Sequence, residues 1–199
     1  MAATKKSSPK PTTAKSKKSV TSVASKGTSA APGNFTVPGM ERADGSNVAA
    51  VLQERLGCLI DLSLTLKHVH WNVVGPTFIG VHTMLDPQVD GVAAMIDATA
   101  ERIATLGSSP NGLPGHLVAN RAWDDYKLQR ALVPEHLAEL DSVYVGVIDD
   151  HRKAIEMVSD MDPITEDLLI GQAGILEQYH WFVRAHLESS SGQIHPDSR

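Results

Sequence analysis

Apolar residues recur at helical spacing through long stretches of this chain, and this pattern limits the fold more than any other feature. In residues 48–73, leucine, valine and isoleucine return every three or four positions and form a broad stripe that suits packing against more than one helix. Gly75-Pro76 ends this helix, and a second is predicted from about Phe78 to Leu106, where Gly107 follows. Pro87 lies inside the second helix, so a kink or an early break is predicted there.

Two further helices are predicted in the second half of the chain, over residues 134–159 and 164–188, with Asp162 as a cap for the latter. Residues 108–120 are rich in glycine and proline and predict a loop, which a short helix around residues 124–132 follows. Little in the sequence indicates strands. Four long helices with an extended middle connection predict an all-α four-helix bundle with a short extra helix between its second and third long helices.

Composition divides the chain into three parts. Residues 1–43 are rich in Lys, Ser, Thr and Pro, show no apolar periodicity, and predict a disordered basic tail. Order is predicted to begin near Asp44, with Ser46 or Asn47 capping the first helix. Residues 44–188 would form the bundle, and residues 189–199 a short polar tail.

The formal net charge of −5 hides an uneven distribution. Residues 1–40 contain seven lysines and no acidic residue, whereas the remainder carries 11 basic and 23 acidic residues, a net charge of −12. A basic arm is therefore attached to an acidic body, and the two need separate explanations.

A lone cysteine, Cys58, excludes an internal disulfide framework and fits a reducing compartment. It lies in an apolar stretch, which favours a buried, inert thiol over a reactive one. No signal peptide or membrane span is predicted, because no apolar run of the necessary length occurs. We therefore expect a cytoplasmic protein.

The predicted second helix carries four candidate metal ligands on one face. His82 and Asp86 are four positions apart, as are Asp97 and Glu101, and all four fall within an arc of about 100°. Such ligands suit iron or another hard-to-borderline divalent ion. An ordinary solvated acidic face is the alternative interpretation.

Distance adds a second constraint on these ligands. His82 and Glu101 are nineteen positions apart, or about 28 Å along a straight helix. They cannot hold one ion within a single subunit, but they can if the helix lies antiparallel to its own copy across a two-fold axis. The spacing therefore points to a site between subunits.

A second metal motif, Glu177-x-x-His180, is of the kind found in di-iron sites inside one bundle. Such a site needs a second Glu-x-x-His, and the sequence lacks one, because Ala104 stands three positions after Glu101. Glu177 and His180 are interpreted as surface or packing residues.

The run His70-Trp71-Asn72-Val73, together with Gly75, Phe78, His82, Met84-Leu85-Asp86, Asp97 and Ala100-Glu101-Arg102, resembles the Dps family of miniferritins (DNA-binding proteins from starved cells). The resemblance extends from about residue 47 to residue 188. It implies metal ligands His70, His82 and Asp86 from one subunit, and Asp97 and Glu101 from its two-fold partner. Pro87 and the lengths of both tails depart from the family pattern.

The resemblance further implies a ferritin-like bundle assembled into a hollow shell, a dodecamer of identical subunits. Its chemistry would be the oxidation of Fe(II) to Fe(III), by hydrogen peroxide in preference to O₂, with storage of ferric mineral and protection of DNA from oxidative damage. The inter-subunit site allows two iron positions. Trp71 is a candidate electron donor beside the site, or an aromatic anchor at the dimer interface.

Acidic residues of the body suit inner walls and pores that attract cations. Asp149 and Asp150, with Asp141 two turns earlier, are candidate pore residues, and Asp150 matches a pore position of the family best. An ordinary solvated helix face is the alternative.

The basic arm is predicted to bind DNA without sequence preference, because lysines contact phosphates and no aromatic residue interrupts them before Phe35. Many arms on one shell would act together. A solubilising tail and a transit peptide are the alternatives. The lysines concerned are Lys5, Lys6, Lys10, Lys15, Lys17, Lys18 and Lys26.

Two functions from different classes follow. The first is an iron-storing ferroxidase; the second is a nucleoid-associated structural protein that compacts DNA and whose metal site is secondary. A hydrolase on the same fold has no support, because no Ser-His-Asp or Cys-His pattern is present.

Overall fold

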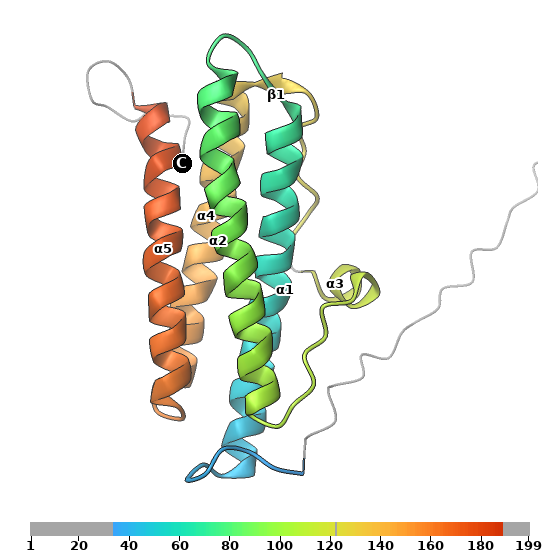
Figure 1. Ribbon diagram of the computed structural model, residues 1–199, viewed down its shortest axis with the longest axis vertical. Coiled ribbons are helices and arrows are strands. Elements are labelled where there is room, and N and C mark those ends of the chain that lie inside the picture. The colour runs from blue at the N-terminus through green and yellow to red at the C-terminus, as the bar shows by residue number, and fades with distance from the viewer. Residues whose placement is uncertain (1–33, 122, 189–199) are drawn as a thin grey trace, which may run out of the picture.

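A computed structural model describes residues 34–121 and 123–188 as a bundle of four long helices (Figure 1). Helix α1 packs mainly against α2 and α4 mainly against α5, and contacts between α1 and α4 join the two pairs. The elements in chain order are α1 Arg42–Asn72, β1 Val73–Val74, α2 Phe78–Thr105, α3 Pro114–Asn120, β2 Ala131–Leu132, α4 Val133–Val158 and α5 Pro163–Leu187.

A long crossover returns the chain along the bundle between α2 and α4, so these two helices run in the same direction (Figure 1). It ends beside the start of α2, where β2 pairs in parallel with β1, Val73 opposite Ala131 and Val74 opposite Leu132. These two-residue strands were not predicted. They form because the chain leaving α1 and the chain entering α4 must both satisfy their backbone groups at one end of the bundle.

The bundle interior is filled by aliphatic side chains, as the scarcity of aromatic residues requires. Leu52, Leu59 and Leu66, seven positions apart on α1, are fully buried, because this spacing returns to one helical face. Cys58 is buried beside them, and burial raises the pKa of its thiol to about 12. The prediction that this thiol is buried is confirmed.

The start of α1 differs from the prediction. The helix begins at Arg42, and Ser46 lies inside it with its hydroxyl donating to the carbonyl of Arg42, 2.9 Å away. The residue before the helix, Glu41, forms no side-chain cap. The prediction of a cap at Ser46 or Asn47 was wrong because packing of the segment before α1, not a capping side chain, decides where the helix starts.

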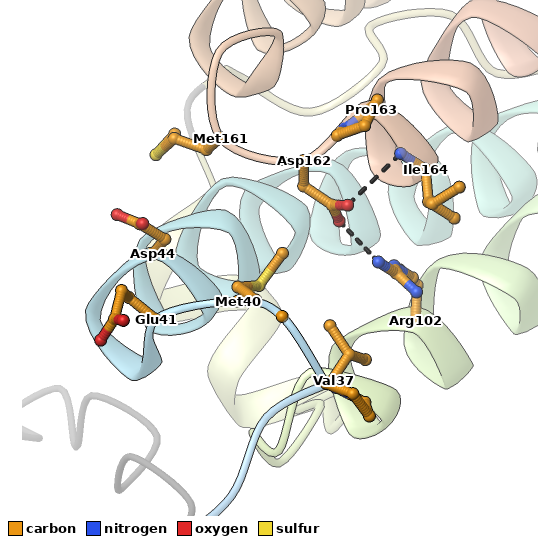
Figure 2. Close-up of a pocket in the computed structure, with 11 residues that line it drawn as sticks. Val37, Met40, Glu41, Asp44, Arg102, Met161, Asp162, Pro163 and Ile164 are labelled. Atoms are coloured by element: carbon orange, nitrogen blue, oxygen red, sulfur yellow. Dashed lines mark hydrogen bonds and ion pairs between the residues drawn. The ribbon is translucent and has the colours of Figure 1, made fainter.

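The end of the bundle opposite β1 shows how that segment is held (Figure 2). Val37 and Met40 pack against the apolar core around α1, and the two line a cavity of about 420 Å³. On its far side Arg102 donates to Asp162, 2.6 Å away, and to the hydroxyl of Thr165, 3.0 Å away. This ion pair ties the end of α2 to the start of α5.

Pro87 does not break α2, which runs without interruption from Phe78 to Thr105. The missing amide deprives the carbonyl of Thr83 of its usual donor, but Thr83 and Pro87 are both exposed, so water can take its place. Tyr179 of α5 donates its hydroxyl to the carbonyl of Pro87, 3.3 Å away. The predicted early break therefore does not occur.

The short extra helix exists, but not where it was predicted. Helix α3 occupies Pro114–Asn120, within the stretch predicted as loop, because Pro114 is suited to the first turn of a helix. Residues 124–130 are not helical; side chains hold them extended, with His68 bonded to the carbonyl of Leu128 at 2.7 Å and Tyr126 donating to the carbonyl of His136 at 3.1 Å.

Candidate metal centre

Two histidines from different helices lie face to face near one end of the bundle. His70 is in the last turn of α1 and His82 is in the second turn of α2, and their ring centroids are 3.7 Å apart. Each ring donates from Nδ1 to the backbone carbonyl of the other residue, at 3.0 Å for His70 and 2.9 Å for His82.

This reciprocal pairing fixes the chemistry of both rings. A histidine that donates from Nδ1 carries its lone pair on Nε2, and a carbonyl that holds Nδ1–H is a common support for a metal-binding imidazole. The backbone therefore presets both Nε2 atoms of His70 and His82 as ligands. The α1–α2 turn brings the two residues together.

Asp86 lies beside this pair, one turn after His82 on α2. Its Oδ1 atom is 3.4 Å from Nδ1 of His70 and 3.1 Å from Nζ of Lys67. The hydrogen bond from Lys67 lowers the pKa of Asp86, so its carboxylate is ionised. The structure thus brings together His70, His82 and Asp86, the three residues predicted to come from one subunit.

Lys67 is a functional candidate that the sequence reasoning missed. Its ammonium group pairs with the Asp86 carboxylate, so a cation binding at Asp86 would have to compete with it. The signal was present in the sequence, since Lys67 stands three positions before His70 and therefore on the same face of α1.

Asp97 and Glu101 lie further along α2, both exposed, and the structure does not bring them to the histidines within one subunit. Within residues 34–121 and 123–188, no group of three or more His, Cys, Asp or Glu side chains is arranged to hold a metal ion. The separation of the two ligand groups agrees with the spacing argument, which requires a second subunit.

Several large apolar side chains are exposed on α1, α2 and α3. Trp71 is 72% exposed and Leu64 is 59% exposed on α1, and Ile79 is 57% exposed on α2. Leu113, just before α3, and Val118 within it are also exposed, and α3 has no buried residue. Exposed apolar side chains of this size are available for contact with another protein surface.

Comparison with known proteins agrees with this geometry. Residues 49–191 match the family described as the ferritin-like domain. Over 161 residues the chain is 58% identical to the DNA protection during starvation protein of Mycolicibacterium smegmatis, covering 81% of this chain and 88% of that relative. The chain belongs to the Dps family of ferritin-like proteins.

Solved Dps structures share the fold. Mycobacterium smegmatis Dps in its tetragonal form is 58% identical, with a TM-score of 0.79, and the match covers 80% of this chain and 97% of that one. DpsA14 from Streptomyces coelicolor is 56% identical, with a TM-score of 0.81 over 83% and 99% of the two chains. The predicted Dps-type bundle is confirmed.

The three predicted pore residues of this Dps subunit lie in different surroundings. Asp149 is exposed and pairs with Lys153, and Asp150 is less exposed and accepts from Lys153 at 3.3 Å. Asp141 is buried, with 7% of its surface exposed, and bonds to Nε2 of His180 at 2.7 Å. The pore interpretation of Asp149 and Asp150 stays a prediction, whereas the surroundings of Asp141 favour a packing role.

The Glu177-x-x-His180 motif of this Dps subunit does not form a metal site in the described residues. Glu177 accepts a hydrogen bond from Nε of Arg152 at 2.9 Å, and Nε2 of His180 is hydrogen-bonded to Asp141. Both partners lie on α4, so the motif links α5 to α4. The interpretation of these two residues as surface and packing groups agrees with these contacts.

The seven tail lysines of the predicted DNA-binding arm lie outside the described residues. No helix in residues 34–121 and 123–188 combines the length and the apolar character needed to cross a lipid bilayer.

Proposed function

We propose that this Dps-family subunit oxidises Fe(II) at a site shared by two subunits, and that the assembled shell, a dodecamer, stores the ferric product. The observation that carries the proposal is the His70–His82 pair, in which backbone carbonyls fix both Nδ1 atoms and leave both Nε2 atoms as ligands. Asp86 supplies the first carboxylate. Asp97 and Glu101 of a second subunit, approaching across a two-fold axis, supply the others.

The two kinds of ligand divide the work. Neutral imidazoles bind Fe(II), and carboxylates stabilise the additional charge of Fe(III), which is the harder ion. Iron is the substrate here, and Asp86 would bind it as an ionised carboxylate. Each hydrogen peroxide accepts two electrons, one from each of two Fe(II) ions, and leaves as two hydroxide ions. Paired oxidation therefore releases no hydroxyl radical. Hydrogen peroxide is the proposed preferred oxidant, with O₂ as the slower one.

Trp71 adjoins His70 on α1 and is 72% exposed in the isolated subunit. Two roles fit this position: an aromatic anchor at the dimer interface, or an electron donor next to the bound iron. A Trp71→Phe variant separates them, because phenylalanine keeps the apolar contact and removes the readily oxidised indole. Unchanged assembly with more radical release on peroxide addition supports the donor role.

The experiment that tests the ferroxidase is anaerobic loading of the assembled protein with Fe(II), followed by peroxide and measurement of ferric absorbance. Wild-type protein should consume about one peroxide for two irons and oxidise them much faster than buffer does. His82→Ala should remove this advantage. His186→Ala is the matched control, because His186 is exposed on α5 and bonds to a carbonyl of its own helix. Oxidation by His82→Ala at the wild-type rate would overturn the proposal.

We further propose sequence-independent DNA binding through the seven lysines of the N-terminal segment, which would place the shell with the nucleoid in the cytoplasm. Two facts support this: the charge asymmetry of the sequence, and the name of the Mycolicibacterium smegmatis relative, a DNA protection during starvation protein. The alternative main function is compaction of the nucleoid with a secondary metal site. A His82→Ala protein that retards DNA normally but oxidises no iron separates the two activities.

A further inference from the structure

A cavity of about 260 Å³ lies between α1, α4 and crossover residues 121 and 123–127, apart from the proposed ferroxidase ligands. Asp61 and Thr65 of α1, Trp123 and Tyr126 of the crossover and Glu139 of α4 line it. Asp61 precedes His70 by nine positions, or about 13 Å along the helix. The cavity thus serves no step of the iron chemistry proposed above.

The walls of this cavity are held by polar contacts. Arg121 donates from Nε to Oδ2 of Asp61 at 3.1 Å, and the indole of Trp123 donates to the same oxygen. At the other end of the segment, Tyr126 donates to the carbonyl of His136. The crossover is therefore fixed at both ends, and the space beneath it does not depend on an occupant.

Two side chains that line the cavity each keep an oxygen without a partner in the protein. Asp61 is 6% exposed and Thr65 is 8% exposed, and among residues 34–121 and 123–188 nothing donates to Oδ1 of Asp61 or bonds to the Thr65 hydroxyl. Neither oxygen is enclosed by protein atoms, so both face the space of the cavity. A hydrogen bond to either oxygen therefore comes from the occupant of the cavity, water or a ligand.

The charges around the cavity favour a cation. Asp61, Asp124, Asp125 and Glu139 line it against Arg121 and Lys127, a net charge of −2. Arg121 is already paired with Asp61 and Asp125, whereas Glu139 has no ion pair in the described part of the chain. Burial, together with the nearby charge of Glu139, raises the pKa of Tyr126, so the Glu139 carboxylate lies close to the cavity wall that Tyr126 forms.

The rest of the lining is apolar and aromatic. Leu62, Val143 and Val147 contribute aliphatic surface, and Trp123 and Tyr126 contribute rings. Aromatic faces attract organic cations, and aliphatic walls favour an alkyl group over the water shell of a metal ion. The volume equals that of about eight or nine water molecules, which suits a small ligand.

We propose that this cavity binds a small aliphatic ammonium compound. Its ammonium group donates to Oδ1 of Asp61 and to Glu139, and its alkyl chain lies against Trp123 and the valines of α4. The ligand takes the place of water at the Asp61 oxygen and neutralises part of the local negative charge. Because it bridges α1, α4 and the crossover, it also stabilises the connection on which the bundle topology depends.

Binding is measured with full-length assembled protein and n-butylamine, by saturation-transfer difference NMR and by equilibrium dialysis at constant ionic strength. Butyrate and 1-butanol are the matched probes, because they keep the alkyl chain and change the charged group. Butylammonium should bind saturably, and the other two at least about tenfold more weakly, since a hydrogen bond to a charged group is lost. Equal binding of butyrate, or no saturable binding of butylammonium, overturns the proposal.

Variants locate the binding. Gly146 of α4 lines the cavity, and a Cβ atom added there meets nothing within 4 Å, so Gly146→Leu should fill the space without strain. Gly171→Leu on α5 is the matched control, because a Cβ at Gly171 also meets open space. Gly146→Leu should abolish butylammonium binding, and Gly171→Leu should leave it unchanged. Wild-type binding by Gly146→Leu would exclude this cavity.

The charge is tested by Glu139→Gln, which leaves the Asp61–Arg121 pair intact and should weaken butylammonium binding about tenfold. Unchanged affinity in this variant would contradict the proposed position of the ammonium group. Peroxide-driven iron oxidation should be normal in all three variants. The cavity variants should lose amine binding and keep normal iron oxidation. His82→Ala should lose iron oxidation and keep amine binding. A failure of one proposal can therefore be told from a failure of the other.

Discussion

Two inactive variants should restore activity to each other if the ferroxidase site is shared between subunits. One chain carries His82→Ala, and the other carries Asp97→Asn with Glu101→Gln. His82 and Glu101 stand nineteen positions apart on a helix that runs unbroken from Phe78 to Thr105, which places them about 28 Å apart. A shell made only of the first variant should therefore lack His82 at every site, and a shell made only of the second should lack both carboxylates at every site.

The expected recovery follows from the two-fold geometry. If equal amounts of the two chains pair at random, about half of the dimers contain one chain of each kind. In such a dimer, one site receives unchanged histidines from one chain and unchanged carboxylates from the other, while the second site is doubly defective. About one quarter of all sites are restored, so the mixed shell should oxidise iron at about one quarter of the wild-type rate.

The assay uses chains with two different C-terminal affinity tags, expressed together and purified through both tags in turn. Peroxide is added to anaerobic Fe(II)-loaded protein, and the initial rise in ferric absorbance is compared at equal protein concentration. The control mixes the two homogeneous assemblies after purification, where chains no longer pair anew, and should stay inactive. Mixed shells no more active than this control would refute the shared site and with it the spacing argument.

Three further predictions concern separate parts of the molecule. Lys67→Met removes the ammonium group that competes for Asp86, so Co(II) measured by calorimetry should bind up to about fivefold more tightly, a size set by the exposure of the pair; weaker binding would show that Lys67 assists the metal instead. Burial lowers the pKa of His151 to about 4, against about 6.5 in an unfolded chain. The unfolded chain therefore binds more protons between these values, and the free energy of unfolding should fall by up to about 3 kcal/mol per subunit as pH drops from 6.5 to 4. His151→Gln, measured by urea denaturation beside the exposed control His186→Gln, should flatten this dependence, and an unchanged slope in His151→Gln would assign it to other groups. Deletion of residues 1–33 removes all seven tail lysines but keeps Val37 and Met40 in the core; DNA retardation should be lost while iron oxidation remains, and retardation at the wild-type level would exclude the arm.

Long-range architecture was predictable because it depends on periodicity. Helical spacing of apolar residues produces a buried stripe wherever it occurs, so the four long helices and the buried Cys58 were expected and found. The same regularity placed four candidate ligands on one face of α2. The ends and positions of individual helices were less predictable. The start of α1 and the position of α3 depend on residues distant in the sequence, and a capping pattern carries no information about them.

The sequence by itself determined that the candidate ligands on α2 fall into two groups too far apart for one ion, because the rise of a helix is constant for every residue. The tertiary structure alone decided how the two histidine rings are positioned and which nitrogen of each is free. The α1–α2 turn brings His70 and His82 together, and each backbone carbonyl fixes the ring of the other residue. It alone placed Lys67 beside Asp86 and enclosed the cavity under the crossover, since both depend on contacts between helices rather than on spacing within one.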